Sequence, residues 1–203
     1  MNSFEKLYKE LRNKYGAPRG QWNLWCKRPK TKKQREEVII GSILTQRTNW
    51  KNAELALDNL KKAGANSLKD IYSLKPKKLG TLIKPAGFYS IKANYLSGLT
   101  RFIIEDCGSI AKMQKKDYCK LREELLEQKG IGPETADSIL LYALDKPIFV
   151  IDEYTRRLVK KRKLAKNLSY DFLQKLFEKR MKKDFRLYQD FHALIVIEGK
   201  KQD

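Results

Sequence analysis

The sequence predicts an all-α protein, and two observations lead to that class. Apolar residues recur at helical spacing along most of the 203 residues, and turns that contain glycine or proline separate the apolar stripes. The one apolar run that could pass for a strand, residues 147–151, has no evident partner, and we find no internal repeat or low-complexity linker. A compact helical fold is therefore expected.

In the first half of the chain, each apolar stripe predicts a helix that a turn then ends. Phe4, Leu7 and Leu11 share one face of a first helix, which the segment from Gly16 to Pro18 breaks. A loop to about Lys33 follows. The other helices expected here cover residues 36–46, 50–63, 73–82 and 90–106, with a short capped helix that starts at residues 67–70.

In the second half, turn chemistry places the helix boundaries. A helix ends near Leu126, and the tight turn at residues 129–133 leads into the next helix, because Pro133 suits the first helical position. The remaining helices are expected at residues 133–143, from Asp152 onward, at 170–181 and at 186–197.

The charge balance predicts a polyanionic partner. The chain carries 44 Lys and Arg against 24 Asp and Glu, for a formal charge of +20, and these cations are spread along the whole chain. A folded core with this excess suits nucleic acid. A generally lysine-rich proteome is the alternative explanation, and an acidic membrane surface is a weaker third.

Cysteine, histidine and apolar runs limit the compartment and the cofactors. Cys26, Cys107 and Cys119 lack metal-ligand spacing and are expected to be free thiols in a reducing cytosol, and His192 is the only histidine. No secretory signal begins the chain, and no apolar run approaches the roughly 20 residues of a membrane span. We expect a cytoplasmic, nucleoid-associated monomer with no membrane partner.

The segment around residues 129–135 is predicted to bind a phosphate. Gly130 and Gly132 allow a sharp reversal, with Ile131 between them, and expose backbone N–H groups at the start of a helix, where the helix dipole also favours an anion. Lys129 adds charge beside this turn. A plain helix–helix turn is the alternative, and Thr135 stands where a dinucleotide-binding fingerprint would need a third glycine.

Asp152 is the candidate catalytic carboxylate. It follows the apolar run at residues 148–151 and opens a helix, so that backbone N–H bonds can cap the helix and keep the carboxylate ionised. A cap alone is the structural alternative. An ionised carboxylate beside a cleft can instead stabilise an oxocarbenium-like sugar or activate an attacking water.

Several segments together resemble the endonuclease III, or HhH-GPD, superfamily of DNA glycosylases. The order of hairpin, helix, apolar segment, aspartate and helix is similar to that family, and the resemblance runs from about residue 3 to residue 200. The segments that carry it are residues 43–50, 85–93, 130–136, 150–154 and 191–200.

The resemblance implies a fold of two helical lobes, of which one covers about residues 34–143 and the other about 1–33 with 144–203. Double-stranded DNA would lie across the cleft, with the target nucleotide flipped into it. Asp152 would then be the catalytic carboxylate, and Gln46 the wedge that fills the gap left by the flipped base. The hairpin residues would be Lys129, Gly130, Ile131, Gly132 and Thr135.

Two departures from the family pattern limit the chemistry. Glu134 stands at the position of the lysine that forms a Schiff base in bifunctional relatives, which implies a monofunctional enzyme that leaves an abasic site for an AP endonuclease. The four cysteines that hold an iron–sulfur cluster in most endonuclease III relatives are absent after the last helix, so we expect no cluster and no cofactor beyond a monovalent cation at the hairpin. Ser42, where the adenine-specific mismatch branch has glutamate, argues against that branch.

The pattern most resembles the bacterial 3-methyladenine glycosylases that lack the cluster. Trp22 or Trp25 could stack on a cationic alkylated purine, a contact worth roughly 0.5–2 kcal/mol, or could simply pack the loop on the core. That branch also has a lysine in its last helix at the position of Leu194, and this chain lacks it. Tyr154 and His192 complete the candidate base pocket, although a hydrogen-bonded helix residue is the favoured interpretation of His192. The candidate phosphate contacts are Arg47, Lys51, Arg156 and Arg157.

Three functions remain open at this point. A monofunctional glycosylase for damaged bases, best matched to alkylated purines such as 3-methyladenine, is favoured. The same fold could serve a pyrimidine or G:T/G:U mismatch glycosylase. A non-catalytic helix-hairpin-helix DNA-binding protein is the third, and an aspartate at position 152 argues against it.

Overall fold

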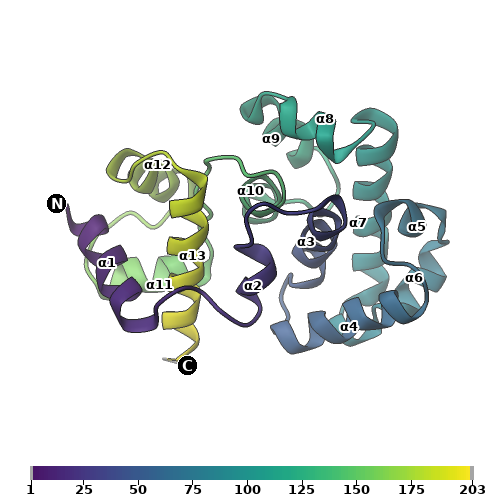
Figure 1. Cartoon of the computed structure of the whole chain (residues 1–203), viewed down its shortest axis with the longest axis horizontal. Coiled ribbons are helices and arrows are strands. Elements are labelled where there is room, and N and C mark those ends of the chain that lie inside the picture. The colour runs from purple at the N-terminus through teal and green to yellow at the C-terminus, as the bar shows by residue number, and fades with distance from the viewer. Residues whose placement is uncertain (1, 202–203) are drawn as a thin grey trace. The chain divides into compact units, whose positions relative to one another are not determined.

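The computed structural model describes residues 2–201, and within that range every regular element is helical, which confirms the all-α class. Two compact units are present (Figure 1). One is the continuous segment Pro29–Ile139. The other combines the described residues up to Arg28 with those from Leu140 onward.

The unit Pro29–Ile139 is built around α3. From Val38 to Leu44 every residue of this helix is buried, and α4, α7, α8 and α10 contact it, which explains why its sequence is apolar on all sides. The elements of this unit are α3 (Lys32–Leu44), α4 (Trp50–Lys62), α5 (Leu68–Ser73), α6 (Pro76–Leu82), η1 (Lys84–Ala86), α7 (Tyr89–Arg101), η2 (Phe102–Asp106), α8 (Ile110–Lys115), α9 (Tyr118–Leu126) and α10 (Pro133–Ser138).

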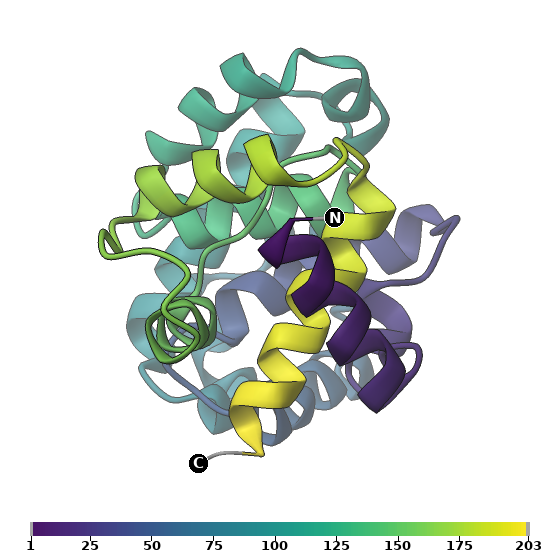
Figure 2. The ribbon, with the colours of Figure 1, turned by 90° about the vertical axis from the view of Figure 1, so that its left-hand side faces the viewer.

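The other unit is built around the last helix. Figures 1 and 2 show α1 beside α13, and α11 also packs on α13. Phe149, in the connection before α11, stacks on Phe177 of α12 at 4.2 Å between ring centroids. The elements here are α1 (Ser3–Tyr15), α2 (Trp22–Trp25), η3 (Ile139–Ala143, which begins one residue before the unit), α11 (Glu153–Lys161), α12 (Tyr170–Arg180) and α13 (Phe185–Lys200).

Four elements differ from the sequence prediction. α3 begins at Lys32, because Thr31 and Gln34 form a capping box ahead of the first apolar residue. Residues 22–25, predicted as loop, form one helical turn. The helices predicted to run to residues 106 and 143 change into the wide π turns η2 and η3 before they end.

The described residues include no helix with the length and hydropathy needed to cross a lipid bilayer.

Candidate DNA-binding hairpin and active site

The predicted hairpin lies between α9 and α10, and its first glycine is required by the structure. Gly130 has φ +84°, and a Cβ there would lie 2.2 Å from the Tyr95 ring. Gly132 has ordinary backbone angles, and nothing lies within 4 Å of where its Cβ would be. No side chain among residues 2–201 caps α10, and the space beside Gly132 at the N-terminus of this helix is open, which suits an anion.

Gln46 contacts this hairpin directly. Its Nε2 donates hydrogen bonds of 3.0 Å to the carbonyl of Gly130 and 3.0 Å to Oγ1 of Thr135. The glutamine and the hairpin, singled out separately in the sequence, therefore meet in one place. They border a pocket of about 600 Å³, whose walls also include Arg47, Phe88, Ile91, Lys92, Tyr95 and Glu134.

Two side chains of that pocket were missed by the sequence analysis. Phe88 is 61% exposed and has φ +46°, so a large apolar ring stands in solvent at the start of α7. Lys92 is 2% exposed, and its Nζ donates to the carbonyls of Leu44 and Ala86, each at 2.8 Å. Burial lowers the pKa of Lys92 to about 8. A lysine is normally read as a surface residue, so composition gave no signal for this one.

The predicted cap at Asp152 is present in the other unit. Oδ1 of Asp152 accepts hydrogen bonds of 2.7 Å from the backbone N–H of Thr155 and 2.7 Å from its Oγ1, at the first turn of α11. Oδ2 lies 3.4 Å from Nε2 of His192. Burial alone raises the pKa of Asp152, but the contact with His192 and the hydrogen bonds from Thr155 outweigh it and lower the pKa. The carboxylate is therefore held ionised at neutral pH.

Three of the four candidate base-pocket residues form one aromatic cluster around Tyr142. Ring centroids of Trp22 and Trp25 lie 5.7 and 5.3 Å from that of Tyr142, and Trp22 lies 6.0 Å from His192. Both tryptophans are buried, at 5% and 7% exposure, so packing is the role seen in this structure. Tyr154 packs instead on Gly199 of α13, where a Cβ would lie 2.3 Å from its ring.

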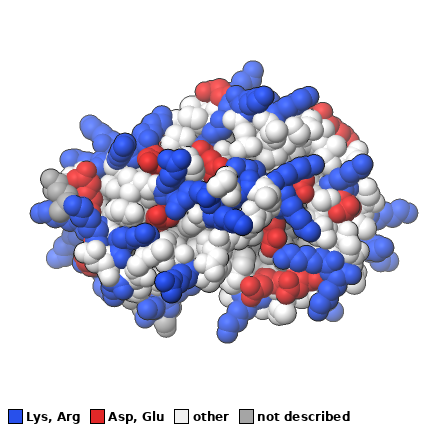
Figure 3. Space-filling model, viewed as in Figure 1, with Lys and Arg blue, Asp and Glu red and all other residues white. Residues whose placement is uncertain are grey.

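The candidate phosphate contacts occupy different environments. Arg47 and Lys51 are exposed and belong to the unit with the hairpin, as does the exposed Lys129. Arg156 lies 3.9 Å from Glu153, and the Arg157 guanidinium lies 4.8 Å from the Tyr154 ring centroid. Figure 3 shows Lys and Arg spread across the visible surface of both units, with fewer Asp and Glu.

A further cation near Asp152 was not singled out in the sequence. Burial lowers the pKa of Lys200, at the end of α13, while the charge of Asp152 opposes that effect. The Nζ of Lys200 donates to Oε1 of Gln21 at 2.8 Å. The lysine lies eight residues after His192 on the same helix, beyond the spacing of three or four residues at which side chains on a helix are neighbours, so the sequence gave no signal for it.

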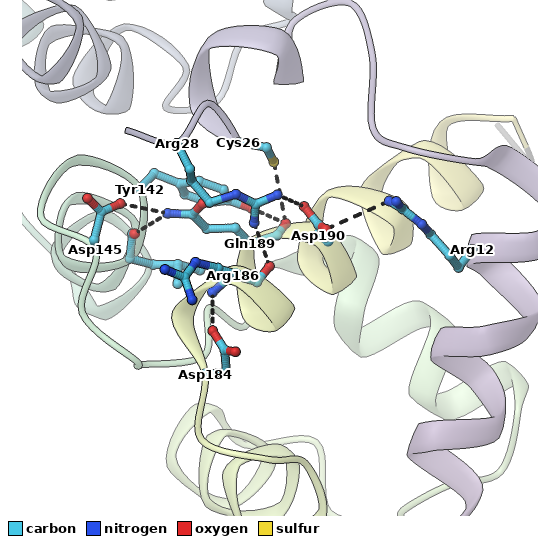
Figure 4. A network of polar contacts seen from close by, with 10 residues as sticks. Arg12, Cys26, Arg28, Tyr142, Asp145, Asp184, Arg186, Gln189 and Asp190 are labelled. Atoms are coloured by element: carbon cyan, nitrogen blue, oxygen red, sulfur yellow. Dashed lines mark hydrogen bonds and ion pairs between the residues drawn. The ribbon is translucent and has the colours of Figure 1, made fainter. Parts of the chain in front are cut away.

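A polar network joins Tyr142 of the aromatic cluster to the first half of α13 (Figure 4). The Gln189 carbonyl accepts from Oη of Tyr142 at 3.3 Å and from the Cys26 thiol at 3.7 Å. Next to it, Asp190 pairs with Arg28 at 3.0 Å and with Arg12 at 3.7 Å. These contacts fix the start of α13 and the position of Tyr142.

Within residues 2–201, no three or more His, Cys, Asp and Glu side chains are grouped so that they could hold a metal ion. Cys26 is half-buried, Cys107 buried and Cys119 exposed.

The glycine turn between α9 and α10, with its glutamine partner, makes this a helical protein of the helix-hairpin-helix class. The sequence profile of the HhH-GPD superfamily of base excision DNA repair proteins matches residues 40–183. The chain belongs to that superfamily, which confirms the resemblance drawn from its motifs.

Individual relatives agree with this assignment. A provisionally assigned DNA repair glycosylase of Methanocaldococcus jannaschii is 44% identical, over 98% of this chain and 90% of its own. The crystal structure of the H. pylori 3-methyladenine DNA glycosylase MagIII bound to 1,N6-ethenoadenine superposes with a TM-score of 0.81 at 33% identity, and covers 100% of this chain and 99% of its own. A trapped endonuclease III–DNA covalent intermediate shares the fold, with a TM-score of 0.76 at 16% identity over 99% and 88% of the two chains.

Proposed function

We propose that the protein is a monofunctional DNA glycosylase of base excision repair, which hydrolyses the N-glycosidic bond of a flipped, alkylated purine such as 3-methyladenine. Asp152 is the catalytic carboxylate. The observation that carries this proposal is the environment of that carboxylate, because Thr155 occupies Oδ1 with two hydrogen bonds while Oδ2 makes only a 3.4 Å contact with His192.

An ionised Oδ2 with free acceptor capacity suits the chemistry of this reaction. Breaking an N-glycosidic bond develops positive charge on the sugar, and a fixed carboxylate stabilises that charge or accepts a proton from the attacking water. A purine nucleotide alkylated at N3 or N7, such as 3-methyladenine, carries a positive charge on the base, which leaves as a neutral molecule. Strong acid catalysis at the leaving group is therefore not required.

DNA binding is assigned to the hairpin unit. The open N-terminus of α10 beside Gly132 would take a backbone phosphate, and Lys129, Arg47 and Lys51 would add charge around it. Gln46, held by Gly130 and Thr135, is the wedge that would enter the duplex when a nucleotide is flipped.

The substrate class rests on the likeness to MagIII and on the aromatic cluster. That relative, 33% identical over the whole of this chain, was crystallised with an adenine derivative. Trp22, Trp25, Tyr154 and His192 are the proposed base pocket, in which an indole face would meet the cationic base. Trp22, Trp25 and His192 belong to the aromatic cluster, and Tyr154 packs beside Gly199 of α13.

The proposal also covers lyase activity, cofactors, oligomeric state and localisation. Glu134 stands where bifunctional relatives have the Schiff-base lysine, and a carboxylate cannot attack the sugar to form an imine. We further propose a cytoplasmic monomer with no iron–sulfur cluster, in which a monovalent cation sits at the hairpin and an AP endonuclease processes the abasic site.

A panel of duplexes tests the proposal. Purified protein is incubated with duplex DNA alkylated by dimethyl sulfate, and with duplexes that carry 8-oxoguanine, G:T or G:U, and released bases are counted by chromatography. We expect release of methylated purines alone, with strand breaks only after alkaline treatment. Release of thymine or uracil would favour a mismatch glycosylase, strand breaks without alkali would reveal lyase activity, and no release from any duplex would leave a DNA-binding protein without catalysis.

A further inference from the structure

The catalytic carboxylate is one end of a buried chain of polar contacts. Asp152 Oδ2 lies 3.4 Å from Nε2 of His192, and Nδ1 of the same ring lies 2.7 Å from Oη of Tyr142. Tyr142 is fully buried and His192 is 5% exposed. Among the residues that the structure describes, Nε2 of His192 has no hydrogen-bond partner of standard geometry, and the Asp152 carboxylate lies beside it.

The other end of this series of contacts is the Gln189 carbonyl, which can only accept a hydrogen bond. Oη of Tyr142 also lies 3.3 Å from the carbonyl of Gln189, in the network of Figure 4. The hydroxyl has one proton, which it donates either to Nδ1 of His192 or to this carbonyl.

This arrangement selects the tautomer of the neutral imidazole. If Tyr142 donates to Nδ1, the ring is neutral and its proton is on Nε2. If the ring is doubly protonated, Nδ1 donates to Oη, and Oη donates to Gln189. Both states direct an N–H at Asp152. The other neutral tautomer would set a bare nitrogen lone pair against the carboxylate, which electrostatic repulsion disfavours.

We propose that His192, oriented by Tyr142, is a positioning residue that holds Oδ2 of Asp152 in place and in its ionised form for excision. The inference rests on the proposed role of Asp152. A contact of 3.4 Å is long for a hydrogen bond, as such contacts often are before substrate binds, and we expect it to shorten in the complex with DNA. In this role neither His192 nor Tyr142 transfers a proton to the substrate.

The side chains around His192 protect the contacts among Asp152, His192 and Tyr142 from water. Trp22 and Phe149 stand edge-on to the imidazole at 6.0 and 6.4 Å between ring centroids, which shields it from water. Burial raises the pKa of Tyr142 well above its usual value, so this residue stays a neutral hydroxyl. The other titratable or charged groups that act on the chain are Cys26, Arg28, Asp190 and Lys200.

Nitrogen NMR tests the tautomer in the wild-type protein. Because His192 is the only histidine, untagged protein labelled with ¹⁵N-histidine gives the signals of one imidazole. We expect the proton on Nε2 and an acceptor shift at Nδ1 whenever the ring is neutral, and a mixture of tautomers in Tyr142→Phe. A neutral ring protonated on Nδ1 in the wild type would overturn the proposal without any variant.

The pH profile of excision tests the role. His192→Phe removes the N–H that faces Asp152, so the pKa of Asp152 should rise, the acidic limb of the single-turnover rate should move to higher pH, and the rate should fall roughly 10- to 100-fold. His192→Gln, whose amide N–H can reach the same carboxylate, should restore part of the rate and part of the position of the acidic limb. Tyr142→Phe should shift the limb in the same direction by less.

Three outcomes separate this inference from the proposed function. On dimethyl sulfate-treated duplex, an inactive Asp152→Asn with unshifted His192 variants would refute the positioning role alone. An active Asp152→Asn would refute the proposed mechanism as well. Rates that fall without any shift of the acidic limb, and without recovery in His192→Gln, would show that His192 serves packing only.

Discussion

Lys92 illustrates how burial changes the chemistry of one side chain. Its ammonium is removed from water and its Nζ meets two carbonyl oxygens, those of Leu44 and Ala86. Burial disfavours the charged ammonium, and a neutral amine still has two N–H bonds to donate to these two carbonyls. The folded protein therefore releases this proton with a pKa of about 8, against an ordinary value of 10.5.

Stability should depend on pH through Lys92. Between pH 8 and 10.5 the unfolded chain holds the proton and the folded chain does not, so the unfolded state binds more protons and the free energy of unfolding rises with pH. In urea titrations across that window, the free energy of unfolding of the wild type should increase relative to that of Lys92→Met by up to about 1.4 kcal/mol per pH unit. Lys51→Met controls for the loss of one charge. A difference between wild type and Lys92→Met that is flat with pH would show that Lys92 keeps its proton.

At this scale, sequence prediction succeeded where the chemistry is local. Asp152 was expected to cap its helix, and Thr155, three residues on, supplies the two hydrogen bonds. The contact between His192 and Tyr142 joins residues 50 positions apart, and only the packing of η3 on α13 brings them together. No local pattern records such a contact.

Among the elements, the hairpin makes unequal demands on its two glycines. Gly130 combines a left-handed backbone with the Tyr95 ring against its Cα, so both the φ angle and the space require glycine. Gly132 has room for a side chain, and its φ of −92° suits any residue. A methyl group at Gly132 would instead project into the space where we place the phosphate.

The two glycine-to-alanine variants should separate folding from binding. Gly130→Ala should lower the free energy of unfolding by at least about 1 kcal/mol, because its φ penalises a Cβ, with the displaced Tyr95 ring adding to the loss. Gly132→Ala should fold with near wild-type stability and yet bind duplex DNA more weakly. Urea unfolding and fluorescence anisotropy with one labelled duplex measure both quantities. Equal stability in the two variants would contradict the role assigned to Gly130.

Helix boundaries depended on signals of different strength. The glycine and proline punctuation placed the ends of α4 and the start of α10 within a residue. α3 begins four residues before the predicted start at residue 36, because Lys32 and Lys33 made this segment resemble a charged loop and the capping box of Thr31 was not recognised. The wide turns η2 and η3 leave the apolar spacing almost unchanged, so periodicity could not reveal them.

For the whole molecule, the dominant property is a net charge of +20. Lys and Arg are spread along the whole sequence, and on the face that Figure 3 shows they lie on both units, so the attraction of a polyanion does not depend on one tail. This property was fully available from composition. The division into units at residues 28/29 and 139/140 depends on tertiary contacts, and the sequence resemblance had suggested boundaries near 33 and 143.

DNA affinity should therefore fall steeply with salt. The logarithm of the association constant should decrease linearly with the logarithm of salt concentration, as expected when cations displace counterions from phosphates. Arg47→Ala and Lys129→Ala should each reduce the size of this slope by about 1 if they contact phosphate. Lys69→Ala, an exposed lysine of α5 that does not border the pocket at the hairpin, serves as the comparison. A slope near zero in the wild type would rule out phosphate-driven binding.

The central claim is that Asp152 performs the chemistry while the hairpin unit supplies the grip on DNA. Asp152→Asn is the direct test, because asparagine caps a helix as well as aspartate does and so preserves the fold. With dimethyl sulfate-treated duplex under single-turnover conditions, base release should fall by roughly 100-fold or more, while duplex affinity stays within about twofold of wild type. Release at the wild-type rate would contradict the account.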